Sequence, residues 1–138
     1  MRLRSASRFL VLPLSLFLAG CGGAAGPDLG TVTGKVTLDG QPVSRAIITF
    51  TPEKGPPSYG GSNAEGQYSV FFTADKTGAV IGKHSVTIET GNTATDDNGK
   101  PLPDQNITKI PKKYAKADTL TVEVKPGANE IPLVLESK

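Results

Sequence analysis

Short stretches of alternating apolar and polar residues recur along most of the chain, and they constrain its fold more than any other feature. In residues 31–38, Val32, Val36 and Leu38 share one side with Gly34, while threonines and a lysine occupy the other. A period of two is typical of a β-strand with one buried face. Residues that favour turns separate the stretches, about every 8–12 residues over much of the chain. The predicted strands are 31–38, 45–51, 67–72, 83–90, 119–125 and 130–136, with a seventh, short strand near 59–63.

These strands predict an all-β chain, since no segment has the strong 3.6-residue period of an amphipathic helix. Each predicted strand has one apolar face, which must be buried against other strands. The expected fold is a seven-stranded antiparallel Greek-key β-sandwich over residues 31–138. The polar segments 52–61 and 91–109 are expected to be loops, and Tyr114 is expected to anchor the segment that follows the second loop.

The first 20 residues follow a different pattern, which predicts that they are removed from the mature protein. Residues 1–8 contain three arginines and no acidic residue, and residues 9–19 form an apolar run. Such a run is too short to cross a hydrocarbon core of about 30 Å as a helix. Its length is typical of the apolar region of a signal peptide, and Pro13 weakens it further as a lasting helix.

The apolar run ends in Leu18, Ala19, Gly20 and Cys21. This segment resembles the bacterial lipobox, in which a cysteine follows small residues and a leucine. The resemblance implies that the thiol of Cys21 receives a diacylglyceryl group, that cleavage occurs before Cys21, and that the new amine is acylated with a fatty acid such as palmitate. Two or three acyl chains anchor a protein durably, whereas a single chain binds membranes only marginally. The alternative is an ordinary secretory signal in which Cys21 has no special role.

The lipobox divides the chain into three parts. Residues 1–20 are the predicted lipoprotein signal peptide, residues 21–30 a flexible tether from the lipidated cysteine, and residues 31–138 the β-domain. The predicted location is the cell envelope, with the lipid bilayer as partner through acylated Cys21. Gly22 after the cysteine, in place of an aspartate, is compatible by the same resemblance with outer-membrane sorting.

Cysteine content and charge exclude several other classes of function. Cys21 is the only cysteine, so internal disulfides, four-cysteine zinc sites and iron–sulfur clusters cannot form. The whole chain has 15 basic and 13 acidic side chains, but three of the basic ones lie in the predicted signal peptide. The mature chain is therefore slightly acidic, and we predict no binding of nucleic acid.

Several turn and strand motifs of the β-domain resemble the carboxypeptidase regulatory-like domain, a transthyretin-like sandwich. The family has a Gly-x-Val strand followed by an Asp-Gly-x-Pro turn, then an acidic-Gly-x-Tyr turn and a Gly-x-Tyr-x-Val strand. The corresponding segments here are Gly34–Val43, Asn63–Tyr68, Gly82–Val86 and Val124–Asn129, with Ala46 also matching. The similarity covers residues 31–135. Together with the lipobox and the Ile110–Tyr114 segment, it is similar to small lipoproteins found in Planctomycetes.

Catalytic chemistry is not predicted from the residue types present. His84 is the single histidine; it stands where the family often has Tyr, on one face with Val86 and Ile88, which favours a place in or near the core. A serine or cysteine triad needs a histidine base beside an activated nucleophile. The catalytic transthyretin-like relatives, the hydroxyisourate hydrolases, end in Tyr-Arg-Gly-Ser, whereas this chain ends in residues 133–138, LVLESK.

Acidic residues supply only weak candidates for a metal site. Asp96, Asp97 and Asp104 could in principle contribute oxygen ligands for calcium, but the spacing of an EF-hand is absent. A solvated turn explains them better, and we predict neither a metal nor another cofactor. A Lys–Asn isopeptide bond, known in some related sandwiches, is not expected, because Lys35 points away from the core and Asn129 lies in a turn.

The leading prediction is a membrane-anchored, exported lipoprotein whose β-sandwich is a non-catalytic binding or structural module. One alternative is an accessory domain that binds a glycan or an envelope protein through loops 52–61 and 91–109. A second alternative is an enzyme with an unrecognised carboxylate-based site.

Overall fold

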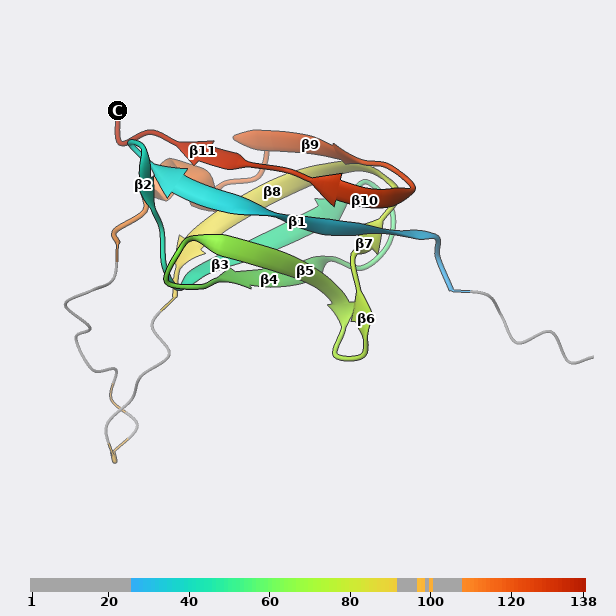
Figure 1. Cartoon of the computed structure of the whole chain (residues 1–138), viewed down its shortest axis with the longest axis horizontal. Coiled ribbons are helices and arrows are strands. Elements are labelled where there is room, and N and C mark those ends of the chain that lie inside the picture. Colours follow the sequence, from blue (N-terminus) through green and yellow to red (C-terminus); the bar gives the residue numbers. More distant parts are fainter. Residues whose placement is uncertain (1–25, 92–96, 99, 101–107) are drawn as a thin grey trace, which may run out of the picture.

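A computed structural model describes residues 26–91, 97–98, 100 and 108–138, and nearly all of its regular structure is β-strand (Figure 1). The prediction of an all-β chain is therefore confirmed. One 3₁₀ turn, η1 (Lys112–Ala115), is present, and among the described residues no helix is long and apolar enough to span a membrane. The strands are β1 (Leu29–Leu38), β2 (Gln41–Pro42), β3 (Ala46–Pro52), β4 (Ser58–Ser62), β5 (Gln67–Thr73), β6 (Lys76–Thr77), β7 (Ala79–Val80), β8 (Gly82–Thr90), β9 (Leu120–Val124), β10 (Gly127–Glu130) and β11 (Leu133–Leu135).

The longer strands form one curled sheet in the order β10-β1-β5-β4-β3-β8-β9. Strands β2, β7 and β11 also pair with β1, and β6 pairs with β5. Most neighbours are antiparallel, but β10 and β11 run parallel to β1. Figure 1 shows β1 lying between these two strands on one side and β5 on the other.

The observed strands agree closely with the seven predicted ones, apart from the short strands β2, β6 and β7, which were not predicted, and differences at the ends of the domain. Strand β1 begins at Leu29, so the folded domain starts within the predicted tether 21–30. The predicted final strand, 130–136, is split by Pro132 into β10 and β11, and residues 127–130, expected to lie mostly in a turn, belong to β10. The sheet is antiparallel as predicted except at β1, where β10 and β11 run parallel to it because the chain crosses after β9 to the opposite edge of the sheet. The Greek-key sandwich of two separate sheets stays a prediction.

The hydrophobic core lies inside the curl. The phenyl ring of Phe50 on β3 lies 6.4 Å from the ring of Tyr68 on β5, although β4 separates these strands in the sheet. Curling therefore brings the inward faces of non-neighbouring strands into contact. The buried apolar residues are Val32, Val36, Val43, Ala46, Ile48, Phe50, Tyr68, Val70, Ala79, Val86, Ile88, Tyr114, Val124, Leu133 and Leu135.

Gly66, in one of the turn motifs, lies against the residues that flank another, the Asp39–Gly40 turn. Asp39 and Gly40 both have positive φ, 49° and 81°, which is the conformation of a tight type I′ hairpin turn. Gly66 in the second turn accepts a hydrogen bond from the Val36 N–H at 2.8 Å. A Cβ on Gly66 would come within 2.6 Å of the Val36 carbonyl oxygen, and its φ is 78°. Only glycine, which has no Cβ, can adopt this positive φ without strain and also leave room for the carbonyl oxygen.

Tyr114 is buried, as predicted. Its hydroxyl accepts a hydrogen bond from the Glu136 N–H at 2.8 Å and donates one to the Glu136 carbonyl oxygen at 3.3 Å. Tyr114 thus fastens η1 to the segment that follows β11.

Candidate functional site

The lipobox residues Leu18, Ala19, Gly20 and Cys21 lie outside the described residues, as do Asp96 and Asp104. Asp97 lies in an exposed turn. Among the described residues, no three His, Cys, Asp or Glu side chains are grouped so that they could hold a metal ion.

The sheet has two ends, and the two predicted loops begin at different ones. The Ile81 N–H donates a hydrogen bond to the Asp28 carbonyl oxygen, so the start of β8 lies beside the segment that leads into β1. Pro52 pairs with His84 near that same end, whereas Ala46 pairs with Thr90 at the other end of β8. At about 3.3 Å per residue, the nine residues of β8 separate the two ends by roughly 27 Å.

The predicted loop 52–61 therefore begins near Asp28, and the predicted loop 91–109 begins at the far end, beside η1 (Figure 1). Part of the first segment is not a loop, since residues 58–62 form β4. The two segments therefore begin at opposite ends of the sheet, but β4 runs back along β3, so Gly61 pairs with Ile47 near the Thr90 end.

His84 lies in the core, as its alternation with Val86 and Ile88 predicted. It is 1% exposed, and its ring lies 5.8 Å from that of Phe50. Nε2 lies 2.6 Å from the Val80 carbonyl oxygen, which assigns the ring proton to this nitrogen. Nδ1 has no hydrogen-bond partner among the described residues. Buried in this way, the imidazole is not positioned to act as a base on a substrate in solvent.

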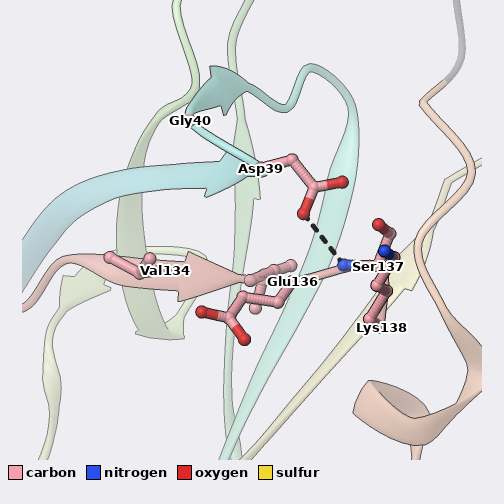
Figure 2. A pocket seen from close by; sticks show the side chains of 7 residues that line it. Asp39, Gly40, Val134, Glu136, Ser137 and Lys138 are labelled. Atoms are coloured by element: carbon pink, nitrogen blue, oxygen red, sulfur yellow. Dashed lines mark hydrogen bonds between the residues drawn. The ribbon is translucent and has the colours of Figure 1, made fainter.

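A depression of about 560 Å³ lies beside the β1–β2 turn, and Figure 2 shows the side chains that line it. The carboxylate of Asp39 accepts a hydrogen bond of 3.0 Å from the Ser137 N–H. Hydrogen bonds from Ser137, supported by the charge of Lys113, hold the pKa of Asp39 below its usual value. In Figure 2 the side chain of Glu136 points away from this bond. Asp39 thus fixes the position of the segment after β11. The side chains that line the depression do not point toward one shared ligand position.

Two residues were considered for an isopeptide bond, Lys35 and Asn129. Lys35 is exposed. The side-chain amide of Asn129 accepts a hydrogen bond from the Lys125 N–H at 2.9 Å and donates to the Lys125 and Thr31 carbonyl oxygens. Asn129 therefore braces the turn between β9 and β10.

A group of exposed apolar side chains on the outer face of β3, β4 and β5 was missed at the sequence level. Tyr59 is 55% exposed and Phe71 44%, and these two residues are directly opposite each other on β4 and β5. Ile47 on β3 is 43% exposed and pairs with Gly61, two residues after Tyr59. We call Ile47, Tyr59 and Phe71 the outer-face patch. The sequence could have indicated that Phe71 points outward, because it lies an odd number of positions from the buried residues Tyr68 and Val70 and therefore faces the other side of the strand.

Comparisons with known proteins do not assign a family. No protein family matches the sequence, and no curated protein matches it. One similar solved structure is that of a DUF3823 family protein from Parabacteroides merdae, with 18% sequence identity and a TM-score of 0.45. The match covers 79% of this chain and 46% of the other, so this chain corresponds to less than half of that protein.

Proposed function

We propose that this chain is an exported lipoprotein whose acylated Cys21 holds a non-catalytic β-domain at a membrane of the cell envelope. The observation that carries the proposal is the lipobox. Leu18, Ala19, Gly20 and Cys21 follow an apolar run and a basic start, and Cys21 is the only cysteine. Diacylglyceryl transfer modifies a thiol, and this explains why a chain that cannot form an internal disulfide has a cysteine at position 21.

The position of the first strand supports a short tether. Strand β1 begins at Leu29, so seven residues, 22–28, separate Cys21 from the folded domain. A segment of this length spans at most about 25 Å when fully extended. The domain then sits close to the lipid surface, with the Asp28 end toward the membrane and the Thr90 end away from it.

The domain is proposed to be a sandwich of the carboxypeptidase regulatory-like type. The packing of Gly66 against Val36, Pro42 and Val43, which flank the Asp39–Gly40 turn, supports this proposal, because these residues belong to the motifs that carry the resemblance. A binding role is favoured over catalysis because His84, the one imidazole of the chain, is buried and bonded to Val80.

Intact-mass measurement of the chain from membranes tests the anchor. The expected product begins at Cys21 and carries the added mass of a diacylglyceryl group and an N-acyl chain. A Cys21→Ser variant should remain an unprocessed precursor, whereas Ala25→Ser, outside the lipobox, should be processed and acylated as usual. A product that begins at Cys21 without acyl mass would contradict the proposal.

A further inference from the structure

We propose that the outer-face patch binds a neutral glycan, with a sugar ring lying over Tyr59 and Phe71 beside Gly61. This inference rests on the proposed binding role of the domain, but it does not depend on acylation of Cys21. It assigns the ligand to the face of the sheet rather than to the loops at its two ends.

The pairing of the strands places the two aromatic residues next to each other. Tyr59 pairs with Phe71 on one side and with Thr49 on the other. Directly opposed residues in an antiparallel sheet have Cβ atoms about 4.5–5.5 Å apart. Both rings are about half exposed, so each offers part of its surface to a ligand.

Gly61 leaves open space beside these rings. It pairs with Ile47 on β3 and with Ser69 on β5, and its outward side has no side chain. The nearest atom to a Cβ built on Gly61 would be the Ala46 carbonyl oxygen, at 3.7 Å. The space above Gly61 is therefore open, so a sugar ring that lies over Tyr59 and Phe71 meets no side chain at Gly61 beside it.

Hydrogen-bonding groups continue from the patch across the sheet. The row that contains Gly61 extends through Ser69 to Thr33 on β1. These two hydroxyls, with Lys35, Gln67 and Glu130, line a groove of about 420 Å³ on the same face. Aromatic surface thus borders a strip of hydroxyl, amide and charged groups.

This combination matches the chemistry of a pyranose. One face of such a ring presents C–H groups, which pack favourably on the electron-rich face of an aromatic side chain. Its rim carries hydroxyls, which can exchange hydrogen bonds with Ser69, Thr33 and Gln67. The patch itself carries no charge, and the groove beside it has one lysine and one glutamate, so a neutral sugar fits better than an anionic polymer.

Two other occupants fit less well. The three side chains of the patch expose roughly 250 Å² together, judged from typical side-chain areas, whereas a stable interface buries about 800 Å² on each partner. The patch is therefore too small to hold a second copy of the chain. Strand β4 is hydrogen-bonded on both sides, to β3 and β5, so an extended peptide cannot add to it as another strand.

The test uses the acylated chain in a detergent without a sugar headgroup, titrated with uncharged hexasaccharides of glucose, xylose, mannose and N-acetylglucosamine. We expect at least one to bind in calorimetry. Tyr59→Ala should weaken binding by about tenfold or more. Gly61→Thr should do the same by filling the open space beside the rings, and it should leave the fold intact because the site has room and threonine favours strands.

Val134→Ala is the matched control, because Val134 is 65% exposed on β11, away from the patch, and its truncation should leave binding unchanged. The inference is overturned if no hexasaccharide binds at up to about 10 mM, or if Gly61→Thr binds as tightly as the unaltered chain. It is also overturned if the chain is a dimer that Tyr59→Ala dissociates. Failure of the anchor would instead appear in the mass of Cys21, and glycan binding by a Cys21→Ser chain would be unaffected.

Discussion

The same substitution should destabilise the domain at one of two buried serines on β4 and not at the other. The Ser62 hydroxyl accepts a hydrogen bond from the Ala46 N–H at 2.9 Å and donates one to the Val43 carbonyl oxygen at 2.6 Å. It therefore satisfies two buried backbone groups at the start of β3. The Ser58 hydroxyl is also buried, but it has no hydrogen-bond partner among the described residues.

Ser62→Ala leaves the Ala46 N–H and the Val43 carbonyl without this partner while changing the side-chain volume little. An unsatisfied buried polar group costs about 1–3 kcal/mol, so we expect the free energy of unfolding to fall by about 2–4 kcal/mol. In a domain of this size the melting temperature should fall by roughly 10–20 °C. Ser58→Ala removes a hydroxyl that is desolvated without compensation, so the free energy of unfolding should stay within about 0.5 kcal/mol or rise.

Urea unfolding of the purified chain in detergent, followed by far-UV circular dichroism, measures both effects. Ser58→Ala controls for the intrinsic strand preference of the substitution, because both serines lie on the inward face of the same strand. Equal losses in the two variants would refute the reasoning, since the two hydrogen bonds of Ser62 would then contribute nothing. A loss above about 1 kcal/mol for Ser58→Ala would show that its hydroxyl is satisfied after all.

Three further predictions concern the turns and the core. Tyr68 donates a hydrogen bond to the Ile131 carbonyl oxygen, and burial raises the pKa of its hydroxyl above 10. The folded state therefore holds this proton more tightly than the unfolded state, so its contribution is complete below pH 10 and is lost as pH rises above it. Tyr68→Phe should lower the free energy of unfolding by about 1–3 kcal/mol at pH 7 and flatten its decline at alkaline pH, as urea titrations across pH will show. Gly66→Ala should cost about 2 kcal/mol or more, because it adds a backbone clash to the strain of a positive φ, whereas Gly40→Ala, with open space around it, should cost only about 1 kcal/mol of strain in the same assay. Asn129→Ala should remove the bonds that brace the β9–β10 turn, and faster hydrogen exchange at Lys125 should report it; unchanged protection would contradict this role.

The sequence by itself determined the class of fold and most strand positions. Alternation in residues 31–38, 67–72 and 83–90 identified inward residues such as Val32, Val70 and His84, because a strand turns successive side chains to opposite faces. Turn chemistry is equally local, which is why the Asp39–Gly40 hairpin and the glycine at position 66 were recognisable. The lipobox is a linear motif around Cys21, so its prediction needs no structure.

Tertiary structure decided what depends on contacts between distant residues. The parallel pairing of β10 and β11 with β1 follows from the path of the chain after β9, which alternation does not encode. The outer-face patch exists because Tyr59 and Phe71, 12 positions apart in the sequence, are placed in register by the pairing of β4 with β5. Alternation shows that a side chain points outward, but only the register of the strands shows which outward side chains lie together.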